Sequence, residues 1–269
     1  QFDVLTIGSY ETPIWARRGW LRSLDQLPAD YVVDDLIAPI RDGLSYDGSL
    51  YAVPFYGESS MLYYRTDLFD QAGITVSETP TYAEVGEWAK QVHNPDNGVY
   101  GMCLRGKPGW GENMAFLTTL ANTFGGRWFD MDWQPTLDTP EWHNAINFYV
   151  DVMSQYGPPG ASSNGFNENL ALFSTGKCGM WIDATVAAGL LANPEESQVA
   201  ERLGFAPAPI DTYPYGSIWL WSWALAVPET SQSPEAAERF VAWATSQEYI
   251  QLVADQYGWL AVPPGTRTS

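Results

Sequence analysis

The sequence predicts an α/β fold, because short apolar runs typical of buried strands alternate with longer segments that carry helix-capping signals. The first run, residues 2–8, is rich in β-branched residues and ends at a glycine. Hydrophobic residues make up 45% of the 269 residues and charged residues 17%. A chain of this length and composition can form one large domain or two modest domains, each with its own core.

Further strands are expected along the whole chain. Residues 9–27 read as a loop and a short helix, and residues 49–69 as two aromatic strand segments broken near Tyr56 and Gly57. Pro54 marks an edge strand or a crossover, because proline cannot donate a hydrogen bond to a sheet. The remaining strands are expected at residues 99–104, 178–182, 203–206 and 218–227.

Helices are expected where capping residues precede amphipathic segments. Thr81 and Glu84 have the spacing of a capping box, which predicts a helix from residue 82. Thr139 and Ser233 each precede a proline that suits the first helical position. Ser246 caps a further helix that ends at a glycine.

The charge balance limits the partners of the protein. The chain has 13 basic and 32 acidic residues, a net charge of −19. Such a field repels nucleic acid and anionic membranes and disfavours polyanionic substrates, so no nucleic-acid partner is expected. A net negative charge of this size also suits a protein that stays soluble and monomeric.

Four clusters of aromatic and hydrogen-bonding residues follow strands, where α/β folds bind ligands. They are residues 10–15, 56–58, 105–113 and 181–185. Carboxylates accept hydrogen bonds from vicinal hydroxyls, the Arg105 guanidinium donates them, and aromatic rings cover C–H faces, so the clusters suit a polyol or sugar. The candidate ligand-binding residues are Tyr10, Glu11, Trp15, Tyr56, Glu58, Arg105, Lys107, Trp110, Asn113, Asp183, Trp219 and Trp221.

Two of these assignments have a structural alternative. Asp183 could instead cap the start of a helix. Trp219, Trp221 and Trp223 alternate along a predicted strand, so they are expected to face one side of it. That side could belong to the core or could form the wall of a ligand cleft.

Catalysis and metal binding have little support in the sequence. His93 and His143 lack partners at metal-ligand spacing, and Asp130 and Asp132 lack the twelve-residue calcium loop. No catalytic residue, metal site or cofactor is therefore expected, although paired carboxylates leave a glycoside hydrolase as an alternative. Two cysteines are present without a CxxC motif and could pair in an oxidising compartment.

Five stretches together resemble the family 1 extracellular solute-binding proteins of ABC transporters, the maltose-binding-like group, and most closely its sorbitol- and mannitol-type polyol binders. These stretches are residues 3–20, 51–69, 100–116, 157–189 and 258–269. The resemblance implies a two-lobed, periplasmic-binding-protein-like (type II) fold with a hinged interlobe cleft. Residues 1–57 and 219–269 would form the first lobe and residues 58–218 the second, with crossovers at 56–58 and 218–222.

The resemblance also implies a function: a substrate-binding component that captures a polyol of the sorbitol or mannitol type for import through permease subunits. A di- or oligosaccharide is the alternative ligand. Glu58 matches a ligand-contacting glutamate of the family, Tyr10 and Glu11 its first-lobe loop, and residues 105–113 its second-lobe loop. The location implied is periplasmic or otherwise extracytoplasmic, with a lipid anchor as one form.

Two further expectations depend on the resemblance. Cys103 and Cys178 lie next to two strands that carry second-lobe site residues, so we expect them to form a disulfide. Family members carry additional segments before residue 2 and after residue 269, so the chain is expected to be truncated at both ends.

Overall fold

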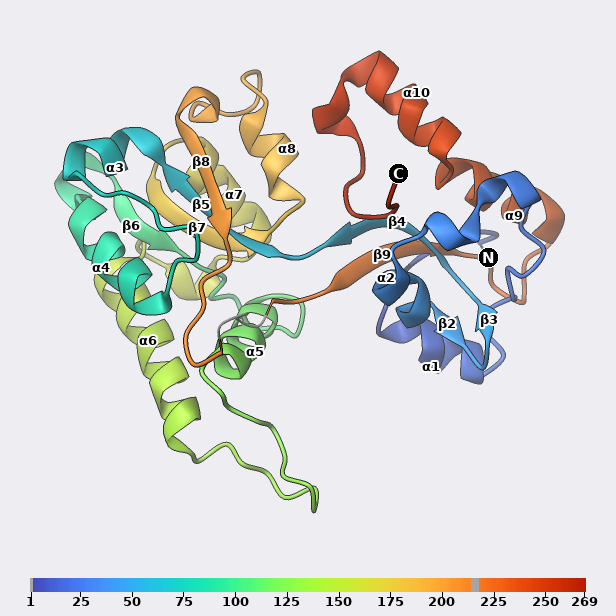
Figure 1. Ribbon diagram of the computed structural model, residues 1–269, viewed down its shortest axis with the longest axis horizontal. Helices are drawn as coiled ribbons and strands as arrows, with labels where there is room; N and C mark the ends of the chain where they lie inside the picture. The colour runs from blue at the N-terminus through green and yellow to red at the C-terminus, as the bar shows by residue number, and fades with distance from the viewer. Residues whose placement is uncertain (1, 214–217) are drawn as a thin grey trace. The chain divides into compact units, whose positions relative to one another are not determined.

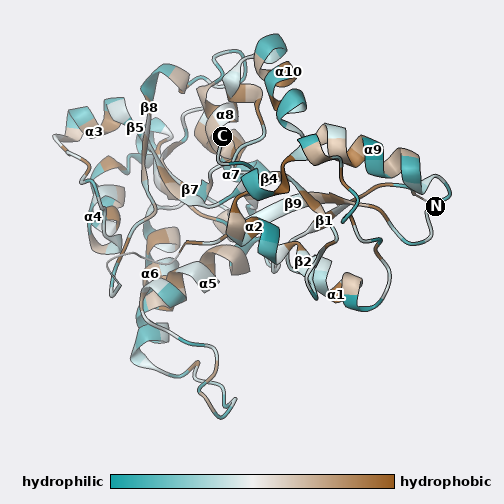
Figure 2. Ribbon diagram, turned by 45° about the vertical axis from the view of Figure 1, so that its right-hand side comes forward, coloured by the Kyte–Doolittle hydropathy of each residue, from teal (hydrophilic) through white to brown (hydrophobic). Residues whose placement is uncertain are grey.

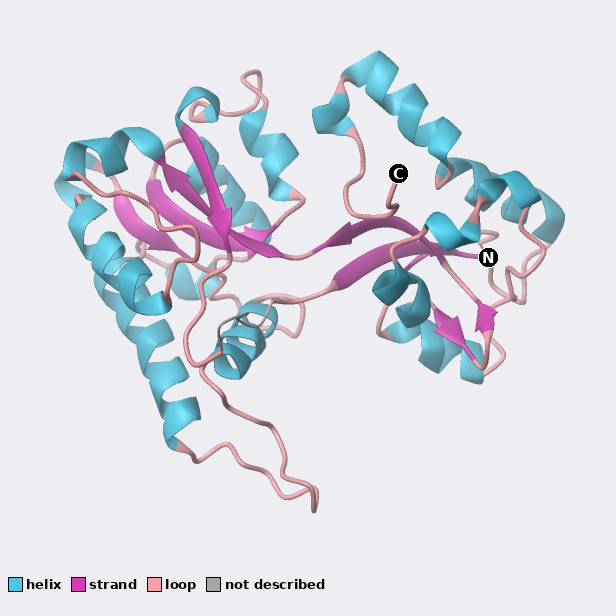
Figure 3. Cartoon of the chain, in the orientation of Figure 1, coloured by secondary structure: helices cyan, strands magenta, loops and turns pink. Residues whose placement is uncertain are grey.

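The computed structural model describes residues 2–213 and 218–269, in which strands and helices alternate along the chain (Figure 1, Figure 3). The chain divides into two compact units. Unit 1 comprises Gln1–Ser59 and Leu220–Ser269, and unit 2 comprises Ser60–Trp219. The chain therefore passes from one unit to the other after Ser59 and again after Trp219.

Unit 1 is built on an antiparallel three-stranded sheet. Its order is β1 (Leu5–Gly8), β9 (Trp221–Ala226) and β4 (Val53–Glu58), with β9 in the centre. Pro54 lies on the edge strand β4, next to a shift in register, as its missing N–H requires. A separate two-stranded ribbon pairs β2 (Ser45–Tyr46) with β3 (Ser49–Leu50).

Amphipathic helices cover this sheet. The helices of unit 1 are α1 (Glu11–Arg17), α2 (Ala38–Gly43), α9 (Pro234–Ala244) and α10 (Gln247–Tyr257). Hydrophobic and hydrophilic residues alternate along α9 (Figure 2), which buries Val241 in a core with Ile7 and Val53. The predicted cap of α10 is confirmed, because the Ser246 side chain accepts a hydrogen bond from the Tyr249 amide.

Unit 2 contains a mixed four-stranded sheet in the order β6-β7-β5-β8. Strands β6 and β7 are parallel, and β5 is antiparallel to both β7 and β8. The strands are β5 (Ser60–Arg65), β6 (Tyr100–Cys103), β7 (Cys178–Ala184) and β8 (Leu203–Pro207). The helices are α3 (Thr66–Ala72), α4 (Tyr82–Val92), α5 (Asn113–Thr123), α6 (Pro140–Tyr156), α7 (Phe166–Ser174) and α8 (Ala187–Ala192).

Single 3₁₀ turns complete the connections in both units. They are Ala29–Tyr31, Val33–Asp35, Pro95–Asn97, Ala161–Ser163, Ala200–Arg202 and Trp259–Ala261.

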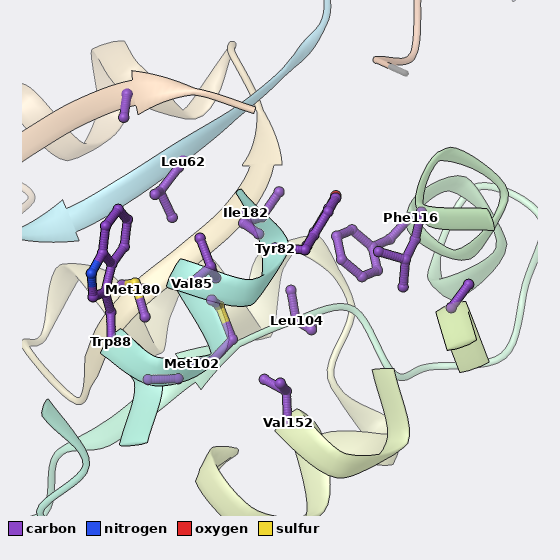
Figure 4. Packing of buried hydrophobic residues seen from close by; sticks show 14 of the residues in the cluster. Leu62, Tyr82, Val85, Trp88, Met102, Leu104, Phe116, Val152, Met180 and Ile182 are labelled. Carbon is purple, nitrogen blue, oxygen red and sulfur yellow. The ribbon is translucent and has the colours of Figure 1, made fainter. Parts of the chain in front are cut away.

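The sheet of unit 2 is buried on both faces, because alternate residues of its strands belong to two different cores. On one face Met180 and Ile182 pack with residues of α4, α5 and α6, as Figure 4 shows. On the other face Tyr63 and Trp181, which lie opposite each other in the β5–β7 pair, pack with residues of α7 and α8. Strand β7 is accordingly buried along its whole length.

The two cysteines form a disulfide between β6 and β7, the parallel pair of the sheet. The Cα atoms of Cys103 and Cys178 are 6.0 Å apart, and both side chains are fully buried. The bond joins the last residue of β6 to the first residue of β7.

Three sequence-based boundaries are wrong. The strand expected from residue 2 begins at Leu5, where its pairing with β9 starts. Strand β4 continues through Tyr56 and Gly57 and breaks only at Ser59, because β9 pairs with it as far as Glu58, opposite Trp221. The strand expected from residue 218 begins at Trp221, where its pairing with β4 starts. Trp219 is therefore not on the strand that carries Trp221.

Candidate ligand-binding site

The best-defined polar site lies at the carboxyl ends of β6 and β7 in unit 2. Because these strands are parallel, Arg105 after β6 and Asp183 near the end of β7 meet at the same edge of the sheet. Arg105 Nε donates to the Asp183 carboxylate oxygens at 3.2 and 2.9 Å, and Nη2 donates to Oδ1 at 2.6 Å. This side-on, bidentate arrangement fixes the plane of the guanidinium.

Asp183 is a fully buried carboxylate that is satisfied within the protein. Besides Arg105, it accepts hydrogen bonds from Trp181 Nε1 at 3.0 Å and from the Ala184 amide at 2.6 Å. Helix α8 begins after Val186 without a side-chain cap, so the alternative of Asp183 as a helix cap is wrong. The carboxylate orients Arg105 and does not face solvent.

Two aromatic rings flank the Arg105 guanidinium. Its Cζ lies 5.2 Å from the centre of the Phe166 ring and 5.7 Å from that of Trp219. Arg105 Nη1 donates to the Gly111 carbonyl at 2.6 Å, which ties the following loop to the cation. The side chain is only 10% exposed, so its position is set by the protein and needs no ligand.

The loop after Arg105 is held by its own polar residues. Asn113 Oδ1 accepts a hydrogen bond from the Gly109 amide at 3.1 Å. Glu112 accepts one from the Phe166 amide at the start of α7, at 3.3 Å, and pairs with Lys107 at 3.7 Å. Trp110 is exposed between these anchors. The loop thus presents Trp110 on an ordered backbone.

Unit 1 brings four of the candidates together. Tyr10 and Glu11 start α1 directly after β1, and the Tyr10 ring packs edge-on against Trp221 at 5.0 Å. Glu58 lies opposite Trp221 in the β4–β9 pair, which places their side chains on one face of the sheet. A Cβ on Gly8 would collide with both Trp221 and Glu11, so only glycine allows this approach.

Of the other two candidates in unit 1, Trp15 lies elsewhere, whereas Tyr56 lies on the same face of the sheet as Glu58. Trp15 packs against Trp20 at 5.7 Å and against the core of unit 1, away from the face that carries Trp221. Tyr56 lies opposite Trp223 in the β4–β9 pair. Trp221 and Trp223 share the partly exposed face of β9, while the opposite face is buried, so they are not the centre of the core.

Sequence reasoning missed Phe166 and the Gly111 carbonyl, and it placed Trp181 in a ligand cluster without its contact to Asp183. Phe166 is remote from Arg105 in sequence, and the one available signal is its position after Gly165 at the start of a helix. Trp181 and Asp183 alternate along β7, but strand pairing alone does not reveal that the indole N–H reaches the carboxylate. These contacts depend on the tertiary packing of α7 against the sheet.

Within residues 2–213 and 218–269, no three His, Cys, Asp or Glu residues converge as a metal site. No helix in those same ranges combines the length and apolarity needed to cross a bilayer.

The chain belongs to the bacterial extracellular solute-binding protein family, whose model matches residues 1–251. It is 56% identical over all 269 residues to the mannitol-binding protein of Pseudomonas aeruginosa, of which it spans 62%. The resemblance to this family that the sequence stretches indicated is therefore confirmed.

Solved structures of solute-binding proteins also match this chain. A solute-binding protein of an ABC transporter from Agrobacterium vitis, with bound D-mannitol, matches the whole chain with a TM-score of 0.96 and 58% identity. One from Agrobacterium radiobacter in complex with ribitol matches with a TM-score of 0.86 and 25% identity. The chain covers 65% and 67% of these proteins, respectively. The predicted α/β class of the binding-protein type is confirmed, while the hinge stays a prediction.

Proposed function

We propose that the protein captures a hexitol of the mannitol type and delivers it to the permease of an ABC importer. The observation that carries the proposal is the 58% identity, over the entire chain, to a solute-binding protein that holds D-mannitol. The relative at 56% identity is likewise a mannitol-binding protein.

The chemistry of the two residue clusters supports this proposal. A hexitol offers hydroxyls that both donate and accept hydrogen bonds, on a chain whose C–H groups are apolar. Arg105 supplies N–H donors, and Glu11 and Glu58 supply acceptor oxygens. The rings of Tyr10 and Trp219 supply apolar faces for the C–H groups.

Binding without catalysis follows from the same proposal. The relatives are transport proteins, and closure on the ligand would be a shift in population toward the state with higher affinity. A buried disulfide fits an extracytoplasmic, oxidising location. We place the protein there as a monomer that contacts permease subunits.

The test is isothermal titration calorimetry of the full-length protein with D-mannitol, sorbitol, ribitol and maltose. Saturable heat with the hexitols, weaker heat with ribitol and none with maltose is expected. Arg105→Ala should weaken mannitol binding at least about tenfold, a loss of about 1.4 kcal/mol. Arg202→Ala, in which an exposed cation is removed from the same unit, serves as the matched control.

Two results would contradict the assignment. Binding of maltose or longer saccharides without any heat from hexitols would favour the oligosaccharide alternative. Turnover of an aryl glycoside that is abolished by Glu58→Gln would show that the protein is an enzyme.

A further inference from the structure

Both cations of the site in unit 2 are already paired inside the protein. Arg105 is paired with Asp183 through three contacts of 2.6 to 3.2 Å. Lys107, on the loop that follows, is paired with Glu112 at 3.7 Å. The site therefore presents donor groups without surplus positive charge.

The geometry of the Arg105 pair determines which kind of acceptor the arginine can bind. A guanidinium binds carboxylate or phosphate most strongly through two parallel N–H donors on one edge. In Arg105 the edge formed by Nε and Nη2 is directed at Asp183, and Nη1 donates to the Gly111 carbonyl. An incoming anion would have to compete with a carboxylate that is part of the fold.

Asp183 cannot easily move away to admit such an anion. Its side chain is 1% exposed, and Trp181 Nε1 and the Ala184 amide hold it from two further directions. The Phe166 and Trp219 rings both pack near the guanidinium, with their centres 5.2 and 5.7 Å from its carbon. The ion pair is thus a fixed element of the site.

We propose that Asp183 is a positioning residue that acts as a charge filter: by neutralising and orienting Arg105, it makes the site accept neutral polyols and reject their carboxylate or phosphate derivatives. This inference rests on the proposed function and adds the ligand's charge class to it. A hydroxyl oxygen accepts a single hydrogen bond without requiring net positive charge. An anion would lose its hydration and gain no unpaired cation in return.

The chain contains a matched ion pair for comparison. Arg65 donates from Nε and Nη2 to Asp67 at 2.7 and 2.6 Å, and from Nη1 to the Gly176 carbonyl at 3.0 Å. The pattern reproduces that of Arg105. Arg65 lies at the carboxyl end of β5, however, whereas Met61 at the start of that strand pairs with Asp183. Asp67→Asn is therefore a control for the loss of a similar pair away from the site.

The experiment compares D-mannitol with D-mannonate, which carries a carboxylate in place of one terminal hydroxymethyl group. Calorimetry is carried out on the full-length wild type, Asp183→Asn, Asp183→Glu and Asp67→Asn. For each protein it gives the ratio of the association constant for mannitol to that for mannonate. Partial unfolding scales both constants equally, so this ratio reports selectivity alone. We expect the wild type to favour mannitol, Asp183→Asn to lower the ratio at least about tenfold, and Asp183→Glu to restore part of it. Asp67→Asn should leave the ratio unchanged.

Glu112→Gln provides a second variant that does not depend on a buried charge. Glutamine keeps an oxygen to accept the Phe166 amide but leaves Lys107 without its carboxylate. Because this pair is partly exposed, we expect a smaller fall in the ratio, about threefold.

The possible failures are distinguishable. A wild type that binds mannitol, with the same mannitol-to-mannonate ratio in Asp183→Asn and Glu112→Gln, would overturn the charge filter and leave the proposed function intact. Equal affinity of the wild type for mannitol and mannonate would also overturn it. A wild type that binds no hexitol would refute the proposed function itself.

Discussion

Asp35 anchors the stretch of unit 1 that includes Thr268 and Ser269. It accepts hydrogen bonds from Thr268 Oγ1 and Ser269 Oγ at 2.8 Å each and from Gln247 Nε2 at 2.9 Å, and Arg267 Nη1 lies 3.2 Å away. Burial on its own would raise the pKa of Asp35, but these hydrogen bonds outweigh it and hold the pKa well below its usual value. The ionised form is therefore favoured by folding.

Asp35→Asn should lower the free energy of unfolding at neutral pH. Because the folded pKa is lowered, the stabilisation is present above the unfolded pKa of about 3.9 and is lost as the pH falls below it. Urea titrations from pH 7 down to pH 3 should show the wild type and the variant converging. Asp34→Asn, an exposed neighbour, should change stability little, and a pH-independent difference for Asp35→Asn would contradict this explanation.

At the residue scale, sequence reasoning identified individual groups better than their roles. Tyr10, Glu11 and Trp221 do converge, because a strand end, a helix start and an opposing strand bring them together. Asp183 was expected to contact ligand, yet its side chain is buried against Arg105. Burial of a charge depends on which partner the fold supplies, and spacing along the chain does not contain that information.

Among the secondary-structure elements, α4 and β6 of unit 2 approach each other unusually closely. A Cβ on Gly101 of β6 would collide with the backbone carbonyl of Ala89 in α4. A carbonyl within a helix cannot move aside as a flexible side chain can. The packing of this helix on the sheet therefore requires glycine at position 101.

Gly101→Ala should destabilise the protein by about 2–3 kcal/mol, as expected for overpacking against rigid backbone. The matched control is Gly86→Ala within α4, where a Cβ would meet only the Phe148 ring, at 3.5 Å. That change should be neutral or stabilising by about 0.5–1 kcal/mol, because alanine favours helix. Urea denaturation followed by circular dichroism measures both, and equal effects of the two substitutions would count against the close packing described.

The disulfide links β6 and β7 across 75 residues of sequence. The free energy of unfolding of the double variant Cys103→Ala/Cys178→Ala should be about 2–4 kcal/mol lower than that of the wild type. The main reason is that the unfolded chain without the disulfide is less constrained. Denaturation of the wild type with and without reductant should reproduce the loss, provided that the reductant acts during unfolding. Unchanged stability of the double variant would show that packing alone holds the two strands.

Secondary-structure elements whose ends carry a strong local sequence signal, such as helix-capping residues, could be predicted from the sequence. The Thr81–Glu84 capping box forms as expected, with reciprocal hydrogen bonds at the start of α4. The end of β4 was misplaced because Gly57 looks like a break, whereas pairing with β9 and a hydrogen bond from the Gly57 amide to the Pro264 carbonyl hold it in place. Tertiary pairing overrides local preference there.

For the whole molecule, the family could be inferred from stretches spread along the chain, whereas the contacts that select a ligand could not. The resemblance depends on local sequence stretches, which can be read directly from the chain. The proposed selection depends on the contacts of Arg105 with Phe166 and Asp183, which arise only after the sheet and helices of unit 2 have packed.

Ligand binding should also stabilise the whole protein. Mannitol at about 100 times its dissociation constant should add about 2.7 kcal/mol to the free energy of unfolding, since it binds only the native state. Differential scanning fluorimetry should show a rise in melting temperature with mannitol that is clearly smaller in Arg105→Ala at the same mannitol concentration. A rise of equal size in that variant would show that Arg105 does not contribute to binding.

The most direct test of the central claim is a crystal structure of the full-length protein with D-mannitol. We predict mannitol hydroxyls within hydrogen-bonding distance of Arg105, with Asp183 still paired to it and out of contact with the ligand. Mannitol bound away from Arg105, or in direct contact with a displaced Asp183, would contradict the account.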